Sequence, residues 1–500
     1  MKLFKVIAAL ALLERVKGLK IVQHNFDVLR RSHDETLSKR DSSVDYAEFV
    51  LNNAVTHYQL NISIGTPPQD FLVVLDTGSS DLFVFEDGSE GCSQAANATS
   101  TETTATNLVY GSTPSAYIDA TVSGCGGVGG FDANASSTFN KNETSFADYF
   151  NYKNGTGYWA YDVVSVNNVS VGEMSFGVYA ANFTPVLGIG PIGGELSYVT
   201  YPDNETYQNL PMKMAEQGLI NTPSYSIFLA NSEKNEGSIL FGGVDSSKYD
   251  GDLITVKSAG SADITSNYAG SWSITLSEIT LQKNDEAAVF AEGRYLALLK
   301  SSAAFSTFPS ALYDNLHNFT NATWDEDIDQ YYYDCDQISN TTLTFDFTGA
   351  KIQVPLTSLV FKHAGKCISG IKTHYDYNYD AYFSLGDDFL RNAYVVYDLH
   401  NYEISLAQAS DATGTESIRE ITKKGVPSAK KAKHYSSTYT LNSGPDQITA
   451  ASSLSYYSTA LIASSGSSAE SSKGDAPPNI TYGSGLLLSA FTFLAALCLT

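Results

Sequence analysis

Short runs in which apolar and polar residues alternate recur between residues 46 and 409. Clear cases are Tyr58–Ile64 and Ser273–Leu281, in which apolar residues return at about every second position. A period of two predicts strands that bury one face, and clusters of Gly or Asn separate the runs. Tyr207–Gln217 and Ser310–Asn318 are the segments that favour helices. We therefore expect an all-β fold with two short helical pieces.

The pattern differs before residue 46. The chain opens with a lysine and then runs apolar from Val6 to Leu13. This order is typical of a secretory signal, which we place at residues 1–18; a buried first helix or strand is the alternative. Residues 19–40 are charged and end in the dibasic pair Lys39-Arg40. Such a pair in this position predicts a propeptide with a processing site.

After residue 410 the chain becomes rich in Ser, Thr, Ala and Tyr, with a basic patch near its start. The patch consists of Lys423, Lys424, Lys430, Lys431 and Lys433. With so little apolar content, we expect residues 411–475 to form a stalk without a packed core. The basic patch is interpreted as solvated linker; a second processing site or a cell-wall contact is the alternative.

The last segment, residues 476–500, combines a polar spacer with an apolar tail. Leu486–Thr500 carries no charge but is shorter than the roughly 20 residues that a membrane span needs. Small residues around Gly474 and Asp475 precede the spacer. This order predicts a signal for a glycosylphosphatidylinositol anchor, attached near Gly474 or Asp475, that would tie the protein to the membrane. A tail-anchored helix is the alternative.

Composition narrows the function classes. The 500 residues are 43% hydrophobic and carry a formal net charge of -24. Phosphate binding needs clustered Lys and Arg, so this balance argues against a nucleic-acid partner. It is compatible with an acidic extracellular setting, where a cell-wall polysaccharide would be a further contact.

Many Asn-x-Ser/Thr sequons support a secretory route and a glycosylated surface. Asn61 and Asn479 also head sequons, but we expect Asn61 to be buried in a strand. The glycosylation candidates are Asn97, Asn134, Asn142, Asn154, Asn168, Asn182, Asn204, Asn318, Asn321 and Asn340.

Five cysteines are present, and Cys498 lies in the tail that anchoring would remove. The other four form an even set, as expected in an oxidising compartment, and their spacing suits the local pairs Cys92–Cys125 and Cys335–Cys367. The Ser/Thr/Ala-rich stretch between the first two is expected to be an inserted loop. With no Cys-x-x-Cys motif and scattered histidines, we expect no metal site.

The candidate chemistry begins where an apolar strand, Leu72–Leu75, ends in Asp76-Thr77-Gly78-Ser79-Ser80. A carboxylate directly after a buried strand is unfavourable unless it is hydrogen-bonded. Gly78 allows the backbone to approach the acid, while Thr77 and Ser79 bring hydroxyl groups. An ordinary strand followed by a turn is the alternative for these residues alone.

The surroundings of this motif resemble the pepsin-type aspartic peptidases, and most closely the fungal yapsins. The segments that carry the likeness are Ile62–Gln69, Asp81–Val84, Val186–Gly190, Gly237–Asp245, Leu385–Arg391 and Tyr394–Asp398. Cys335 and Cys367 also fall where that family has a disulfide.

The resemblance implies a bilobal, all-β pepsin-like fold, in which two β-lobes flank a cleft. The lobes would be residues 41–195 and 196–410, each supplying one catalytic aspartate. A peptide or protein ligand would bind in the cleft of a monomer, without a cofactor. Two close carboxylates share a proton, so that one acts as base toward a water while the other acts as acid.

The second motif departs from the family pattern. The matching stretch runs from Tyr295 to Tyr313 and has Lys300 where the second aspartate belongs. Ser301 keeps a hydroxyl, whereas Ser302 replaces the usual glycine, and alanines follow. Asp346-Phe-Thr-Gly349 has one residue too many for a replacement motif.

A lysine in this position reverses the electrostatics. We expect an Asp76–Lys300 ion pair, with roughly 4 kcal/mol of Coulomb attraction at about 4 Å and an effective dielectric of 20, before desolvation. The ammonium group would occupy the place of the nucleophilic water. The sequence therefore predicts an inactive or severely impaired peptidase. A lysine-assisted hydrolase, an active endopeptidase cutting at basic residues and a structural wall glycoprotein are the alternatives.

The expected flap over the cleft also departs from the family. Tyr152 matches the flap tyrosine, but the following strand resumes about two residues early, which predicts a short flap. Asn154 places a sequon at the flap tip. Phe83 stands where the family often has a tryptophan that donates a hydrogen bond to the flap tyrosine, and phenylalanine has no donor.

Overall fold

The structure is a computed structural model of the whole chain. It describes residues 21–30, 56–88, 130–147, 156–166, 169–179, 185–196, 206–229, 236–259, 272–326, 330–363, 365–373, 382–410, 415–438, 454 and 457–458. Within these residues, no helix is both long enough and apolar enough to cross a membrane.

Several features expected from the sequence lie outside the described residues. They are the signal segment, the dibasic pair Lys39-Arg40, Cys92 and Cys125 with the insert between them, the flap residue Tyr152, the anchor region at Gly474 and Asp475, and the sequons at Asn97, Asn154, Asn168, Asn182, Asn204 and Asn479.

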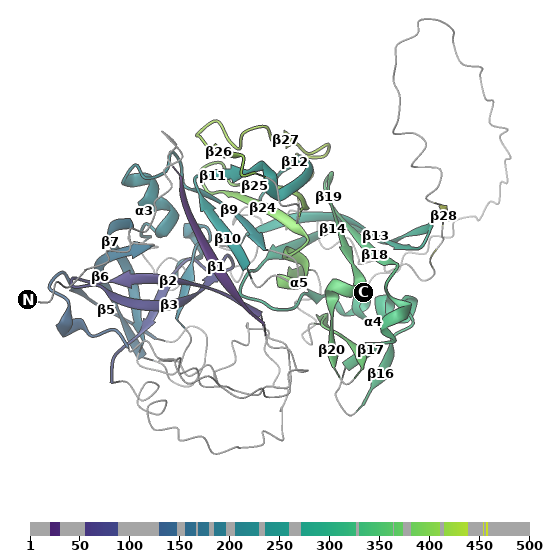
Figure 1. Cartoon of the computed structure of the whole chain (residues 1–500), viewed down its shortest axis with the longest axis horizontal. Helices are drawn as coiled ribbons and strands as arrows, with labels where there is room; N and C mark the ends of the chain where they lie inside the picture. Colours follow the sequence, from purple (N-terminus) through teal and green to yellow (C-terminus); the bar gives the residue numbers. More distant parts are fainter. Residues whose placement is uncertain are drawn as a thin grey trace, which may run out of the picture. The chain divides into compact units, whose positions relative to one another are not determined.

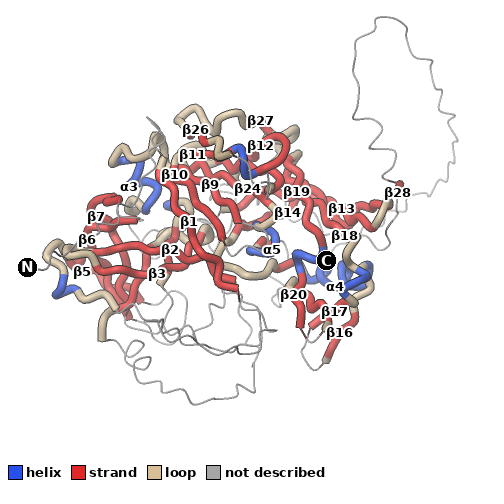
Figure 2. The backbone as a smooth tube through the Cα atoms, in the orientation of Figure 1, coloured by secondary structure: helices blue, strands red, loops and turns tan. Residues whose placement is uncertain are grey.

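The largest sheet runs through both lobes (Figures 1 and 2). Its fourteen strands are, in spatial order, β27 (Lys430–Lys431), β12 (Tyr249–Lys257), β25 (Glu403–Ala409), β24 (Ala393–Asp398), β9 (Ser224–Leu229), β10 (Glu236–Phe241), β1 (Val22–Arg30), β2 (Thr56–Ile64), β3 (Gln69–Asp76), β8 (Val186–Gly188), β4 (Leu82–Phe85), β7 (Val169–Tyr179), β6 (Thr156–Val166) and β5 (Asn140–Ala147).

The N-terminal lobe closes on itself, because β2 pairs with β6 as well as with β3. The strands β2, β3, β8, β4, β7 and β6 thereby form a ring around an apolar interior. Their inward residues, among them Leu60, Val73, Phe176 and Leu187, are at most 1% exposed. The alternating pattern of β2 thus reflects one face turned to this core and one turned to solvent.

Among the residues that the structure describes, the C-terminal lobe contains a second large sheet and two small ones. The eight-stranded sheet consists of β19 (Ala350–Pro355), β18 (Thr341–Phe347), β13 (Ser273–Lys283), β14 (Glu286–Leu299), β23 (Tyr382–Leu385), β15 (Thr307–Phe308) and β22 (Lys372–Thr373), with β28 (Tyr457–Ser458) paired to β14. The small sheets are β16 (Thr323–Asp325), β17 (Gln330–Tyr333), β21 (Lys366–Ser369) and β20 (Val360–His363), and the pair β11 (Gly243–Asp245) and β26 (Ile418–Glu420).

Helices are short and few among the described residues. The α-helices are α3 (Leu210–Glu216), α4 (Ser310–Phe319) and α5 (Asp387–Leu390). Single 3₁₀ turns lie at Ala133–Ala135, Ile192–Gly194, Ser246–Lys248, Cys335–Gln337 and Leu356–Leu359. The predicted all-β bilobal fold is confirmed; α3 lies within the first segment predicted to be helical, and α4 matches the second but extends one residue beyond it.

Strand β1 lies between the halves of the large sheet. Val22–Asp27 pairs with β10 of the C-terminal half, and Asp27–Arg30 pairs with β2 of the N-terminal half. A segment that we assigned to a propeptide therefore supplies an inner strand, and its backbone hydrogen bonds join the two lobes.

Aromatic side chains fill the core below the sheet on the C-terminal side. Tyr225 and Tyr397 stack with ring centroids 4.7 Å apart, and Trp272 donates to the Tyr225 hydroxyl at 2.9 Å. All three side chains are inaccessible to solvent. These rings link β9 and β24 to the start of β13, and so fix the second sheet against the first.

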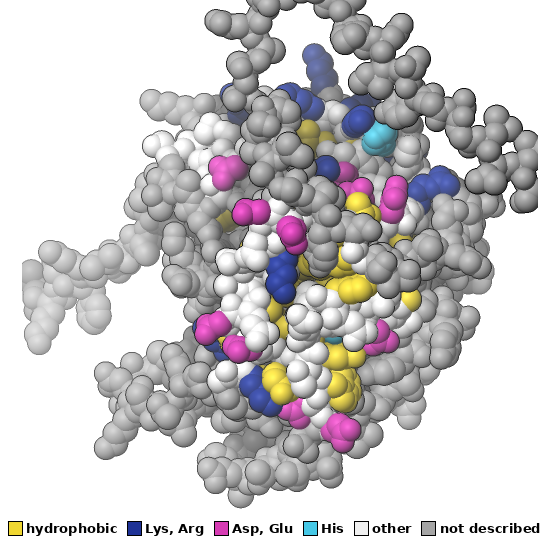
Figure 3. Space-filling model, turned by 90° about the vertical axis from the view of Figure 1, so that its right-hand side faces the viewer, with side chains coloured by type: hydrophobic (Ala, Val, Ile, Leu, Met, Phe, Trp, Pro, Cys, Tyr) yellow, Lys and Arg dark blue, Asp and Glu magenta, His cyan; other side chains and the backbone are white. Residues whose placement is uncertain are grey.

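The stalk expected from residue 411 does not begin there. Residues 415–438 pack on the C-terminal lobe, with β26 paired to β11 and β27 paired in parallel to β12. Ile421 is fully buried and Ala432 is 6% exposed. Figure 3 shows several Lys and Arg side chains near the top of the face that it draws. The lysines of the predicted basic patch are exposed, but their backbone belongs to the folded lobe.

Further along, Leu454 packs against the main core and β28 adds to β14. The predicted stalk was based on low apolar content. That prediction was wrong for this part of the chain, because the segment attaches to the lobe through backbone pairing and only a few apolar side chains. The folded body therefore extends well beyond the boundary expected at residue 410.

Two expectations about individual residues have different outcomes. The disulfide between Cys335 and Cys367 is confirmed. Asn61, expected to be buried, is exposed, because its position on β2 faces solvent. Asn134, Asn318, Asn321 and Asn340 are also exposed, and Asn142 is half-buried.

Candidate functional site

The first loop of the candidate site begins where β3 ends, at Asp76. This strand pairs in parallel with β8, so that Asp76 lies opposite Gly188, and its carbonyl accepts a hydrogen bond from Ile189 N at 3.0 Å. Gly188 is required here because a Cβ atom would come within 2.5 Å of the Asp81 backbone nitrogen. The apolar strand thus delivers its terminal carboxylate to a tightly packed loop.

Lys300 occupies the equivalent place in the C-terminal lobe. It follows β14, which pairs in parallel with β23, and its backbone nitrogen donates to Leu385 O at 2.9 Å. The glycine that follows β23, Gly386, again lies against the loop: a Cβ atom there would be 2.6 Å from Ala303 O. Each lobe therefore has the same arrangement of a strand, a loop and a supporting glycine. The two arrangements differ in charge at the strand end, where one has Asp76 and the other Lys300.

The two loops meet through paired hydroxyl residues. Thr77 N donates to Ser301 Oγ at 3.1 Å, and Ser301 N donates to Thr77 Oγ1 at 3.0 Å. The Thr77 hydroxyl donates in turn to Leu299 O at 2.9 Å, and the Ser301 hydroxyl to Leu75 O at 2.7 Å. Both side chains are fully buried, so these four bonds fix the loops against each other without help from water.

The Asp76 carboxylate is half-buried and accepts two hydrogen bonds at Oδ1. One comes from Gly78 N at 2.7 Å and the other from the Ser302 hydroxyl at 2.8 Å. Sequence reasoning treated Ser302 only as a lost glycine and overlooked this contact. The sequence did contain an indication of this contact. A serine two residues after Lys300 can reach Asp76 of the other loop once the two loops are paired.

The prediction of an Asp76–Lys300 ion pair is wrong. Among the described residues, no carboxylate lies within 4.0 Å of the Lys300 ammonium group. The aliphatic part of Lys300 instead packs over Gly78: its Cγ and Cε atoms lie 3.0 and 3.3 Å from where a Gly78 Cβ would be. Ser302 occupies the position beside Asp76 Oδ1, and the lysine side chain lies across the loop.

A buried acidic cluster supports the first loop from behind. Asp81 accepts bonds from the Tyr207 hydroxyl at 2.5 Å and from Leu196 N at 3.0 Å, while Glu195 accepts one from Tyr207 N at 2.8 Å. Burial raises the pKa of Asp81 to about 6 and that of Glu195 to about 9, where the nearby Asp81 charge adds to the effect. Glu195 Oε1 has no hydrogen-bond partner among the described residues. The arrangement holds Glu195 as a neutral acid at moderate pH.

A similar contact supports the second loop. Asp388, at the start of α5, accepts bonds from Ser306 N at 2.9 Å and from the Ser306 hydroxyl at 2.5 Å. Burial raises the pKa of Asp388 to about 6, although the Ser306 bonds and Arg391 oppose the shift. Ser306 also accepts a bond from Gly386 N at 3.0 Å, which ties the loop to the glycine that supports it.

The flap hairpin is described only at its base, where β5 pairs with β6. Phe83 packs there against Trp159 with ring centroids 5.7 Å apart, and it is 7% exposed. Phe83 therefore belongs to an aromatic cluster at the foot of the hairpin. Trp159 in turn lies 5.6 Å from the Tyr207 ring, so the cluster reaches the buried acids.

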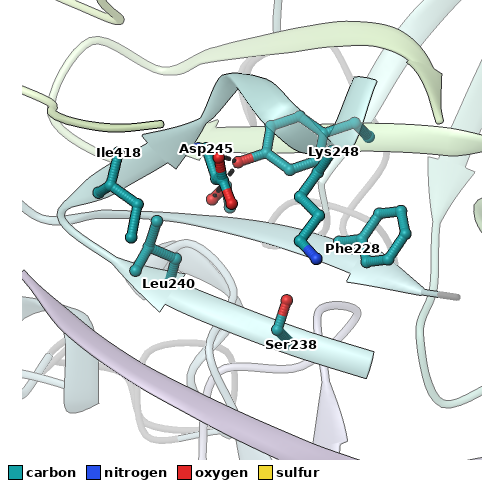
Figure 4. Close-up of a pocket in the computed structure, with 8 residues that line it drawn as sticks. Phe228, Ser238, Leu240, Asp245, Lys248 and Ile418 are labelled. Carbon is teal, nitrogen blue, oxygen red and sulfur yellow. Dashed lines mark hydrogen bonds between the residues drawn. The ribbon is translucent and has the colours of Figure 1, made fainter. Parts of the chain in front are cut away.

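A small pocket elsewhere does not qualify as a ligand site (Figure 4). It lies between β9, β10 and β26, and its volume of about 10 Å³ leaves room for roughly one water molecule. Asp245 in its wall accepts bonds at Oδ1 from Ser247 N and Ser417 N, so this oxygen already serves the fold. Among the described residues, no three His, Cys, Asp or Glu side chains are grouped to hold a metal ion.

Two β-lobes that each bring a strand-end loop to a common, hydroxyl-bonded centre define the aspartic peptidase class. Comparison with known proteins agrees: the sequence model of the eukaryotic aspartyl protease family matches residues 57–409. The chain is 34% identical to aspartic proteinase yapsin-3 of Saccharomyces cerevisiae, over 84% of this chain and 78% of that protein.

Two other relatives are more distant. Barrierpepsin of Saccharomyces cerevisiae is 30% identical over 78% of this chain and 66% of its own length. An acid protease of Saccharomycopsis fibuligera is 30% identical over 72% of this chain and 82% of its own length. The chain therefore belongs to the eukaryotic aspartyl protease family and is a homologue of the yapsins.

Proposed function

We propose that this chain is a yapsin-like pseudopeptidase of the cell surface, which binds a peptide or protein without hydrolysing it. The observation that carries the proposal is Lys300 directly after β14, in the place equivalent to Asp76 at the end of β3. The Thr77–Ser301 bonds that join the two loops are present, although Ser302 replaces the usual glycine beside Lys300.

The chemistry of the site supports loss of hydrolysis. Peptide cleavage by a carboxylate pair needs one group to take a proton from water and a second to give a proton to the leaving amine. Asp76 is a single carboxylate, and Gly78 N and the Ser302 hydroxyl both donate to it. Lys300 carries a positive charge and cannot share a proton with Asp76 as a second carboxyl group would.

The surface location rests on the chain ends. The apolar start, the sequons and the anchor-like C-terminal segment favour a secreted, lipid-anchored glycoprotein. In this setting the folded body would stand on the outer face of the plasma membrane or in the cell wall. Contact with wall polysaccharide is part of the proposal.

An active aspartic endopeptidase is the second candidate. The match to the family and the complete Asp76 loop favour it. It would cut secreted or surface proteins, and the acidic composition favours cleavage at basic residues. A purely structural wall glycoprotein remains an alternative with no residue that specifically supports it.

A peptide digest separates the first two candidates. The secreted full chain is incubated with a mixed peptide library from pH 3 to 7, beside its Asp76→Asn variant and with a transition-state-mimic inhibitor. We expect the same background signal in all samples. Cleavage that both the substitution and the inhibitor abolish would overturn the pseudopeptidase proposal.

A further inference from the structure

Trp324 is a large apolar side chain on the surface of the C-terminal lobe. It lies on β16 and is 41% exposed, whereas the other two tryptophans of the chain, Trp159 and Trp272, are 3% and 0% exposed. A half-exposed indole retains much of the apolar area that folding normally removes from water.

The indole is fixed by a row of rings that leads into the core. Trp324 meets Tyr331 edge to face with centroids 4.9 Å apart, and Tyr331 stacks on His317 at 4.2 Å with an interplanar angle of 11°. His317 is buried in the last turn of α4, held by Tyr313 O and the Ser369 hydroxyl. Trp324 is thus the outermost member of a rigid aromatic row.

A sequon borders the same row. Asn321-Ala322-Thr323 forms the turn from α4 into β16, and Ala322 N donates to His317 O at 2.8 Å. Asn321 has a left-handed backbone (φ 58°), and both Asn321 and Thr323 are exposed. Three residues span at most about 10 Å, so Asn321 and Trp324 flank one end of the row.

We propose that Asn321 carries an N-linked glycan whose innermost N-acetylglucosamine lies on the exposed face of Trp324. A pyranose ring presents C–H groups on its faces, and the electron-rich indole face attracts them while both surfaces leave water. In the modification, Asn321 Nδ2 loses a proton and bonds to C1 of the sugar. The lipid diphosphate of a lipid-linked oligosaccharide donor is the leaving group.

The inference rests on the secretory route of the proposed function but not on the loss of peptidase activity. It distinguishes Asn321 from its neighbour Asn318. The sequon threonine of Asn318, Thr320, is buried and donates to Leu316 O at 2.6 Å. Thr323, by contrast, is exposed, so we expect Thr323→Ala to remove the sequon with little direct effect on packing.

The test uses the full chain secreted from a glycosylating eukaryotic host. Mass spectrometry measures occupancy at Asn321, and acrylamide quenching of tryptophan fluorescence reports on Trp324, because the other two tryptophans are buried. We expect Thr323→Ala to increase quenching and to lower Tm by about 1–3 °C. Thr342→Ala, which removes the Asn340 sequon, is the matched control and leaves quenching unchanged.

A cross with Trp324→Ala completes the test. In that background, Thr323→Ala should cause no further loss of Tm, since the packing partner is gone. An unmodified Asn321, unchanged quenching in Thr323→Ala, or an equal Tm loss in the Trp324→Ala background would each overturn the proposal. A chain glycosylated elsewhere but not at Asn321 defeats this inference alone, whereas a chain with no glycan at any sequon defeats the secretory route.

Discussion

Thr77 and Ser301 each donate a backbone N–H to the other's hydroxyl group, at 3.1 and 3.0 Å, although 224 residues separate them in sequence. Neither bond involves Asp76 or Lys300. The hydrogen bonds that join the two loops are therefore in place, and Lys300 changes the chemistry of the site without removing them.

Restoring the acid should consequently restore activity. We expect the double variant Lys300→Asp with Ser302→Gly to hydrolyse peptides at acid pH, with a rate on the order of 10² above background or more, because a second carboxyl group supplies the missing proton transfer. Peptide digestion followed by mass spectrometry measures it. Adding Asp76→Asn to the same variant is the control and should abolish the gain; a double variant that folds but stays inactive would contradict the idea.

The hydroxyl pair should be important for stability. Thr77→Val or Ser301→Ala leaves buried backbone groups unpaired, and each should lower the free energy of unfolding by about 1–3 kcal/mol. The double variant should lose less than the sum, since each change already breaks shared bonds. Urea unfolding of the four proteins gives the coupling energy. Strict additivity would mean that the loops do not depend on each other.

Stability should decline as the pH rises, because buried acids behind the first loop hold their protons in the folded state. The pKa of Glu195 is raised from 4.5 to about 9, and that of Asp81 from 3.8 to about 6. Between these limits the unfolded chain has released protons that the folded chain retains, so the free energy of unfolding falls. For Glu195 the decline spans about pH 4.5 to 9.

Urea midpoints measured from pH 5 to 8.5 test this slope. Glu195→Gln keeps an acceptor for Tyr207 N but cannot ionise, and it should flatten the decline. The titratable side chains next to Glu195 are Asp81 and Tyr207. Burial and both acids raise the pKa of Tyr207 well above 10, so Tyr207 does not titrate in this range. A wild-type midpoint that rises with pH over this range would refute the assignment.

The C-terminal segment should be required for stability. Truncation after Ser410 removes β26 and β27 and exposes the apolar cluster under Ile421, in which one buried side chain of this size accounts for about 1.5–3 kcal/mol. We expect a clear loss of Tm. Truncation after Ser458 retains every described strand and is the control. Equal Tm values for the two truncated proteins would show that the segment adds nothing.

The disulfide should contribute through the loop it closes. Cys335→Ser with Cys367→Ser opens a loop of 32 residues and should lower the free energy of unfolding by about 2–4 kcal/mol. Urea unfolding of the double variant beside the oxidised protein measures the loss. A double variant as stable as the oxidised protein would contradict this prediction.

Local patterns predicted much of this structure. Alternation located β2 and β13, and the apolar run before Asp76 located β3. The likeness of the flanking residues was sufficient to place Lys300 at the equivalent strand end. These features are encoded within a few neighbouring residues, so no knowledge of distant contacts was needed.

What the sequence did not reveal depends on distant partners. The contact from Ser302 to Asp76 requires the two loops to meet. The predicted Asp76–Lys300 ion pair does not form, because the aliphatic part of Lys300 packs over Gly78. Tyr207 reaches Asp81 across 126 residues. Residues 415–438 look like linker by composition, since their attachment relies mainly on backbone pairing that side-chain patterns do not record.

Strand β1 has a consequence for assembly. Cleavage after Arg40 would leave Val22–Arg30 as a separate peptide, held between β10 and β2 only by non-covalent bonds. The processed protein would then be a two-chain complex whose stability depends on the concentration of its smaller chain. A synthetic peptide with the sequence of β1 would exchange with the cleaved strand in the sheet. If the peptide carries a label, its binding affinity measures how strongly this strand joins the two lobes.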